Sequence, residues 1–350
     1  MKQPAITTIW NTSGEMPPGS SWPRWPNGPR PASEVSSISM NPNRNAEAHA
    51  GPPDPRWYRA ALDRWDRVLL AREGVRLLLK GVRKREVRRA LGWDGPGAQT
   101  GSENQAVWPR VLELGCRTGW LTWLVARQAP VPWTAVDSDA DRLALASARA
   151  TGPTWVRQDP QNLQDALPGA PFDLVIVHPW VANGVPPRQL EAFLRAIRAQ
   201  VDPAAEPGSE GSPGGEGAAQ HGSVLLSLYR PVQLVHRWAR LTGGADLGHW
   251  AWAWQGAYDA DEDRVDLQLL AFLPTSTPGR FARIDEVVEL YVHPLDSLRE
   301  AAEAAGLAGA DRPVARDGHH ALYLLTPDKA VDASGSEGSH QEASHQLSPA

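Results

Sequence analysis

Two glycines follow a short apolar run in the first half of the chain and could form a ligand-binding loop. The segment VLELGCRTGW, residues 111–120, places Glu113 inside the apolar run and Gly115 and Gly119 after it. Glycines at a turn from a strand to a helix allow positive φ angles and a close approach of ligand to backbone. The free N–H groups at the start of the next helix favour a polar or anionic ligand group. The spacing therefore indicates a small-molecule site.

Two common nucleotide-binding loops do not match this segment. The GxGxxG fingerprint of dinucleotide-binding proteins requires glycine at the positions where Arg117 and Trp120 stand. A phosphate-binding P-loop requires a lysine directly after a glycine, and none of the four lysines of the chain follows one.

The segment resembles the first motif of class I S-adenosylmethionine-dependent methyltransferases, in which an acidic residue stands two positions before the first glycine. Here it reads Glu113-Leu-Gly115-Cys-Arg117-Thr-Gly119, with Arg117 in place of the middle glycine. The resemblance covers roughly residues 107–326. It implies S-adenosyl-L-methionine as cofactor and an α/β, Rossmann-like seven-stranded methyltransferase fold, in which a mostly parallel sheet carries helices on both faces. If φ is positive at Arg117, that residue costs on the order of 1 kcal/mol relative to glycine.

The resemblance implies that the cofactor lies at the carboxyl ends of successive strands. Asp137 ends the second strand, where the family places the acid that binds both ribose hydroxyls; the alternative is an N-cap for the helix that begins near Asp139. Asp159 follows the third strand, where the family often contacts adenine, or it forms an ordinary turn before a proline. Glu113 would orient the amino-acid end of the cofactor, or else cap the next helix. The expected cofactor contacts are Glu113, Gly115, Cys116, Gly119, Asp137, Ser138, Asp159 and His178.

His178 follows the fourth strand in FDLVIVHPW and is the candidate catalytic base. Its near-neutral pKa suits it to accept a proton, while the alternative is a local hydrogen bond. Enzymes that methylate amide or base nitrogens often carry Asn/Asp-Pro-Pro-aromatic here, so the sequence His178-Pro179-Trp180 disfavours an adenine-like acceptor. We expect the acceptor to contact Trp180, Tyr229 and Trp252.

Three tryptophans alternate in WAWAW, residues 250–254, so they share one face of a strand. That face is either an aromatic wall for a flat or cationic acceptor or the packing face of an antiparallel cover sheet. Cys116, the single cysteine, is interpreted as a small packed residue beside the cofactor.

Apolar runs that alternate with helix-compatible segments position these residues and predict βαβ units with a parallel sheet. Period-two stretches then predict an antiparallel sheet, followed by a helix and a last strand. The expected strands are 111–114, 133–136, 154–157, 172–177 and 223–229 in the first part and 250–254, 264–273, 287–292 and 320–325 in the second, with helices at 187–200 and 294–305.

Composition, together with the family resemblance, divides the chain into four parts. Segments rich in Pro, Gly and Ser without apolar periodicity are expected to be disordered, whereas a three- and four-residue apolar spacing predicts amphipathic helices. The expected parts are a disordered segment at 1–55, a helical cap and linker at 56–106, a methyltransferase domain at 107–327 with a flexible insertion at 202–221 and a substrate lid at 230–293, and a disordered tail at 328–350.

The chain has 350 residues, 41% of them hydrophobic, and a formal net charge of -5. It can bury a sizeable core, and its charge argues against a protein that coats nucleic acid. A single cysteine excludes a framework of internal disulfides, and the scattered histidines do not form a metal-binding pattern. The chain has no run of about 18 apolar residues, which a membrane-spanning helix would need. We expect a cytoplasmic protein whose partner is a small-molecule acceptor.

Two alternatives stay open at this point. The basic residues from Arg83 to Arg89 would suit a methyltransferase that acts on RNA or protein. Arg117 in the glycine loop would suit a cofactor-binding or scaffold relative that kept the fold and lost turnover.

Overall fold

The computed structural model describes residues 53–69, 109–127, 131–163, 166–201, 222–240, 242–248 and 250–328. All of them belong to one structural unit that extends from residue 42 onward. The expected disordered ends up to residue 52 and after residue 328, the basic residues from Arg83 to Arg89, and the insertion at 202–221 lie outside the described residues.

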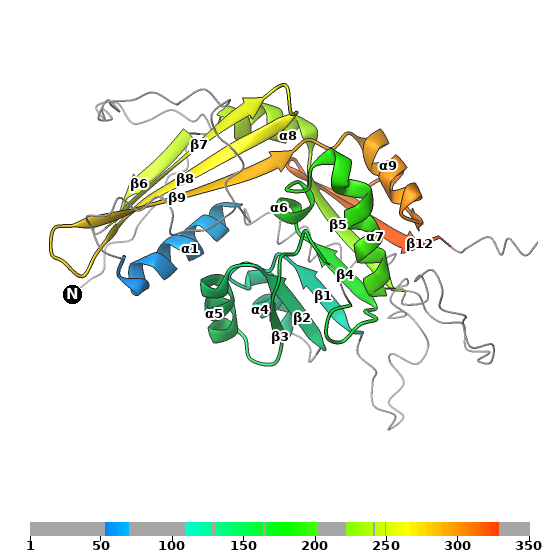
Figure 1. Ribbon diagram of the computed structural model, residues 1–350, viewed down its shortest axis with the longest axis horizontal. Helices are drawn as coiled ribbons and strands as arrows, with labels where there is room; N and C mark the ends of the chain where they lie inside the picture. Colours follow the sequence, from blue (N-terminus) through cyan, green and yellow to red (C-terminus); the bar gives the residue numbers. More distant parts are fainter. Residues whose placement is uncertain are drawn as a thin grey trace, which may run out of the picture. The chain divides into compact units, whose positions relative to one another are not determined.

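The larger sheet has the strand order β10-β12-β5-β4-β1-β2-β3, with β11 paired to β12. Figure 1 labels β12, β5, β4, β1, β2 and β3 of this sheet. The first five strands along the chain are parallel, and β12 runs antiparallel to β5. Seven strands thus lie on the main path, which confirms the predicted fold class. The strands are β1 (Val111–Leu114), β2 (Trp133–Asp137), β3 (Thr154–Arg157), β4 (Leu174–Val177), β5 (Ser223–Tyr229), β10 (Leu307–Ala308), β11 (Ala315–Arg316) and β12 (His320–Pro327).

The central strands are buried on both faces, since every residue of β1, β2, β4 and β5 is buried. Consecutive buried residues are typical of parallel strands covered by helices on both sides. None of the described helices is long and apolar enough to cross a membrane. The described helical segments that follow β1 are α4 (Trp120–Ala126), α5 (Ala140–Arg149), α6 (Pro179–Ala182), η2 (Pro187–Gln189), α7 (Leu190–Val201), α8 (Pro231–His236), η4 (Trp238–Arg240) and α9 (Leu295–Ala304).

The order of the strands reverses at β1, which lies between β2 and β4. From β1 the chain continues to β2 and β3, which lie on one side of β1 within the sheet. It then continues to β4 and β5, which lie on the other side of β1. In open parallel sheets, ligands bind at the carboxyl edge beside such a switch point. A ligand is therefore expected beside the loop after β1 and the ends of β2 and β4.

A second sheet is antiparallel, in the order β6-β7-β8-β9, and we call it the lid sheet. Its strands are β6 (Thr242–Asp246), β7 (Ala251–Asp259), β8 (Arg264–Pro274) and β9 (Phe281–Tyr291). Trp250, Trp252 and Trp254 are all buried, which confirms that they share a face. The sequence did not predict β6, because its TGGAD segment has two glycines and no apolar alternation.

Helix α1 (Pro55–Leu69) is the described part of the expected helical cap. The described residues begin just before it, in the last part of the segment expected to be disordered up to residue 55, where Pro53 bridges to Thr275 and the Asp54 N–H donates to the Pro274 carbonyl at 3.0 Å. The start of α1 is therefore attached to the end of β8, and the helix lies beside the lid strands in Figure 1.

Asn183, at the end of α6, joins the larger sheet to the lid sheet. Its Oδ1 accepts a hydrogen bond from the Tyr229 N–H at 2.9 Å, and its Nδ2 donates to the Tyr291 carbonyl at 2.9 Å. The side chain has no exposed surface, so neither partner can replace the lost bond with water.

Replacing Asn183 by alanine should therefore lower the free energy of unfolding by about 2 to 4 kcal/mol, since an unpaired buried polar group costs about 1 to 3 kcal/mol. Urea unfolding of the full chain measures the loss. Asn162→Ala, at an exposed position, is the control and should change stability by less than about 0.5 kcal/mol. Equal effects of the two substitutions would contradict the role of Asn183.

Candidate active site

The loop between β1 and α4 has three residues in the left-handed region. The φ angles are +81° at Gly115, +50° at Arg117 and +72° at Gly119. A Cβ on Gly115 would overlap the side chains of Val181 and Trp180, so glycine is required there for space as well as for φ. Because φ at Arg117 is positive, arginine is less favourable than glycine at this position by on the order of 1 kcal/mol of backbone strain.

Asp137 lies at the carboxyl end of β2 and faces this loop. Its Oδ2 accepts a hydrogen bond from the Arg117 N–H at 2.9 Å, and its Oδ1 accepts one from the Asp139 N–H at 3.0 Å. The residue is only 5% exposed, and burial raises the pKa of its carboxyl group against the opposing effect of Arg142 and Arg117. A carboxylate oxygen has two lone-pair sites, so each oxygen retains one for a further donor.

The N-cap of α5 is Asp139, so the alternative role considered for Asp137 is wrong. Asp139 Oδ1 accepts hydrogen bonds from the N–H groups of Asp141 at 2.8 Å and Arg142 at 3.1 Å. The backbone places Asp139 in an extended conformation before the first turn, as an N-cap requires. Asp137 is thus not needed to end the helix.

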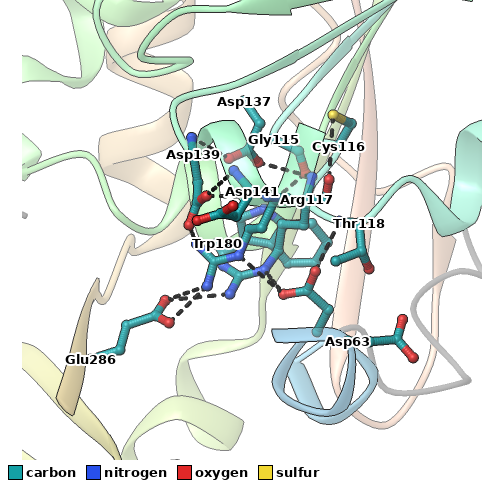
Figure 2. Close-up of polar contacts among 12 residues, drawn as sticks. Asp63, Gly115, Cys116, Arg117, Thr118, Asp137, Asp139, Asp141, Trp180 and Glu286 are labelled. Carbon is teal, nitrogen blue, oxygen red and sulfur yellow. Dashed lines mark hydrogen bonds and ion pairs between the residues drawn. The ribbon is translucent and has the colours of Figure 1, made fainter. Parts of the chain in front are cut away.

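Two buried arginines connect the loop to distant parts of the chain. Figure 2 shows Arg117 between Trp180 and Glu286. We call Arg117, Arg142, Asp66, Asp139 and Glu286 the arginine cluster. Arg117 donates from Nε to Asp66 Oδ1, and the Thr118 N–H donates to Asp66 Oδ2 at 2.8 Å. Arg142 Nη2 lies 2.8 and 2.7 Å from the two carboxylate oxygens of Glu286. The cluster joins α1, the loop, α5 and β9.

The charges in the arginine cluster stabilise one another. Burial alone would raise the pKa of Asp66, but Arg117 and Arg142 outweigh it and lower that pKa. The same balance of burial against the two guanidinium groups lowers the pKa of Glu286. Both carboxylates are therefore ionised at neutral pH.

Glu113 is fully buried and holds three side chains together. It accepts hydrogen bonds from Thr122 Oγ1 and from Trp133 Nε1, the latter at 2.9 Å, and its Oε1 lies 2.7 Å from His178 Nε2. It bonds no backbone N–H of α4 among these contacts, so the capping alternative is wrong. Its carboxylate orients the imidazole of His178 instead.

Trp180 packs against the residues that follow β1 and β4. Its ring stacks on His178 with centroids 4.3 Å apart, and its Nε1 donates to the Gly115 carbonyl at 3.0 Å. The Arg117 guanidinium lies 5.8 Å from the centre of the indole, within the range of a cation–π contact. The structure thus brings Gly115, Arg117, His178 and Trp180 together.

Three further residues expected at the cofactor are Cys116, Ser138 and Asp159, and of these Cys116 contacts the loop through a hydrogen bond from its Sγ to the Arg117 carbonyl at 3.8 Å. Cys116 is buried, and burial raises the pKa of its thiol well above the ordinary value, which makes it a poor nucleophile. Ser138 is exposed and its carbonyl accepts from Arg157 Nε at 3.4 Å. Asp159 is exposed and accepts from the Gln161 N–H at 2.9 Å, as in the turn alternative.

The other two residues expected at the acceptor are also buried. Tyr229 lies between Trp238 and His320, at ring distances of 5.4 and 5.1 Å, and burial raises the pKa of its phenol. Trp252 meets Trp254 edge to face at 5.2 Å, and the Arg64 guanidinium of α1 lies 5.4 Å from its ring. The lid tryptophans therefore pack toward α1.

Sequence reasoning missed Asp66, Arg142 and Glu286. Asp66 stands four positions after Leu62, on the apolar stripe of an amphipathic helix, and Glu286 interrupts the alternation of apolar residues in β9. A charge on a face that should be buried signals a partner elsewhere. Arg142, near the start of α5, offered no comparable signal.

The strand order, the antiparallel β12 and the loop after β1 define a class I methyltransferase fold, as the resemblance implied. Residues 111–204 match the family model described as methyltransferase domain. No curated protein gives a significant match to the chain.

Solved structures agree on the fold. A S-adenosylmethionine-dependent methyltransferase from Clostridium acetobutylicum is 16% identical, with 77% of this chain and 99% of that chain covered and a TM-score of 0.55. DesVI from Streptomyces venezuelae is 12% identical, with 77% and 98% covered and a TM-score of 0.52. At these identities the likeness establishes the fold.

Replacing Asp66 by asparagine should destabilise the protein by about 3 kcal/mol at pH 7, because breaking a buried ion pair leaves uncompensated charge. The folded pKa of Asp66 is lowered, so its contribution is fully present above the unfolded pKa and is lost as pH falls through the folded pKa. The difference from wild type should therefore shrink below about pH 4. Urea unfolding at several pH values measures it.

The matched control for this substitution is Asp141→Asn, in the exposed first turn of α5. It should change stability by less than about 1 kcal/mol at any pH. A difference between wild type and Asp66→Asn that stays constant down to pH 3 would contradict the ion-pair argument.

Proposed function

We propose that the protein transfers a methyl group from S-adenosyl-L-methionine to an oxygen or nitrogen atom of a small molecule. The observation that carries the proposal is the contact between the Arg117 N–H in the loop and the Asp137 carboxylate at 2.9 Å. It joins the positive-φ loop after β1 to the acid at the end of β2, beside the switch point of the sheet.

The residues at this edge fit the chemistry of the cofactor. Asp137 retains one lone-pair site on each oxygen, which suits a pair of ribose hydroxyls. Gly115 and Gly119 provide backbone at a point where a side chain would overlap its neighbours. S-adenosyl-L-methionine supplies an activated methyl group when bound, so the protein needs only to orient the reactants, exclude water and accept a proton.

His178 is our candidate for the group that accepts the proton. Its Nε2 lies 2.7 Å from Glu113 Oε1. In the tautomer with the ring proton on Nε2, the Nε2–H donates a hydrogen bond to that carboxylate, and Nδ1 has the free lone pair. Nδ1 is buried and has no hydrogen-bond partner among the described residues.

The lid sheet is our candidate for the surface that selects the acceptor. Trp252 lies buried on the inner face of this sheet, and Trp180 and Tyr229 lie buried at the ends of β4 and β5. Aromatic walls of this kind bind flat or apolar parts of small molecules. Expected acceptors are therefore small alcohols, phenols, carboxylic acids or amines.

Replacing Asp137 by asparagine should weaken binding of S-adenosyl-L-methionine about 10- to 150-fold, because one charge-assisted acceptor contributes about 1.5 to 3 kcal/mol. Isothermal titration of the full chain with the cofactor and with S-adenosylhomocysteine measures this effect.

The control for the titration is Asp141→Asn, a neighbouring exposed acid, which should bind within about twofold of wild type. Failure of the folded wild-type protein to bind either compound would overturn the proposed function. Binding without turnover on any acceptor would instead favour a non-catalytic relative.

Replacing His178 by glutamine should lower kcat about 100-fold or more, since a positioned general base contributes about 10² to 10⁴. Glutamine can still donate to Glu113, so affinity for S-adenosylhomocysteine should stay within about threefold. Transfer of labelled methyl groups to a panel of phenols, carboxylic acids and amines gives kcat. A parallel loss of affinity and kcat would show that His178 acts only as a local structural residue.

A further inference from the structure

The inner face of the lid sheet carries one carboxylate in an apolar row. The strand register aligns Trp254 of β7 with Leu269 of β8, and Leu269 with Glu286 of β9. Directly paired residues lie on the same face of a sheet. Within β9, the alternate residues Ala282, Ile284, Val288 and Leu290 share that face with Glu286, and three of these four are buried.

Glu286 reaches from the lid sheet to the loop between β1 and α4, residues 115–119, which we call the cofactor loop. Its carboxylate oxygens lie 2.8 and 2.7 Å from Arg142 Nη2, and Oε1 lies 3.4 Å from Arg117 Nη2. The Glu286 side chain is 14% exposed, and the arginine side chains are 8% and 7% exposed. The contact is therefore shielded from solvent, where charge pairs are stronger than at a surface.

Both arginines also contact the loop or the end of β2 directly. Arg117 belongs to the loop, and its backbone N–H binds Asp137. The Arg142 side chain pairs with Asp139 at 3.3 Å, whose own N–H binds the other oxygen of Asp137. A movement of Glu286 would thus be transmitted to both groups that hold the Asp137 carboxylate.

We propose that Glu286 is a positioning residue, which acts through Arg117 and Arg142 to hold the cofactor loop and Asp137 in the arrangement that binds cofactor. For the identity of the ligand, this inference rests on the proposed function. Its consequence is a coupling between the lid sheet and the cofactor loop. A movement of the lid sheet away from the loop would remove the Glu286 carboxylate from Arg117 and Arg142. The positive φ angle at Arg117 would then be less well stabilised.

The chain offers a matched control on the same strand. Glu289 lies on the opposite face of β9, is 45% exposed, and lies 3.4 Å from Arg264 of the neighbouring strand. It shares the strand and the charge of Glu286 but does not contact the loop. Glu286→Asp keeps the charge on a shorter side chain and serves as the conservative variant.

Hydrogen exchange of the full chain tests the inference without any ligand. In Glu286→Gln, the amides of residues 115–120 should exchange about tenfold faster than in wild type, whereas the amides of β4 and β5 should not change. Glu289→Gln should match wild type, and Glu286→Asp should recover part of the protection. Unchanged exchange of residues 115–120 in Glu286→Gln would overturn the inference.

Titration with S-adenosylhomocysteine supplies the second readout. Glu286→Gln should bind about tenfold more weakly than wild type and Glu289→Gln within about twofold, with Glu286→Asp in between. Unchanged affinity in a variant with a loosened loop would overturn the inference while leaving the proposed function intact. If wild type itself does not bind, the proposed function fails, and the exchange comparison alone decides whether Glu286 holds the loop.

Discussion

Two guanidinium groups, those of Arg117 and Arg142, are buried at the carboxyl edge of the larger sheet. Removing a charged group from water costs several kcal/mol per ion, and only well-placed partners offset that cost. The partners come from three separate parts of the chain, Asp66 of α1, Asp139 of α5 and Glu286 of β9. A displacement of α1 or of the lid sheet would leave Arg117 or Arg142 without a carboxylate partner, so the position of both elements depends on these ion pairs.

Arg117 explains how the loop keeps its shape without its middle glycine. A left-handed φ angle is unfavourable for any residue with a Cβ, and glycine avoids that strain. Here the side chain that causes the strain also forms ion pairs with Asp66 and Glu286, which offset it. The loop is thus held from outside, by α1 and β9, whereas a glycine-rich loop depends mainly on its own backbone.

The sequence predicted the larger sheet well because its signals are local. The runs at Val111–Leu114 and Ser223–Tyr229 are mainly apolar, and both are strands with those bounds. It also pointed to Asp137 through the position of that residue at the end of a strand. The arginine cluster lay beyond such reasoning, because its pairs join positions 51 and 144 residues apart, and no periodicity within one element specifies the partner of a buried charge.

The two departures from the family pattern, Arg117 and the His178-Pro179-Trp180 sequence, meet in space. The Arg117 guanidinium lies 5.8 Å from the Trp180 ring, which stacks on His178, and Glu113 binds that imidazole at 2.7 Å. A glycine at position 117 would leave one face of the indole without its cation, and a smaller residue at 180 would leave the guanidinium without its aromatic contact. Arg117 and the His178-Pro179-Trp180 sequence, which lie about 60 positions apart in the chain, are therefore packed together.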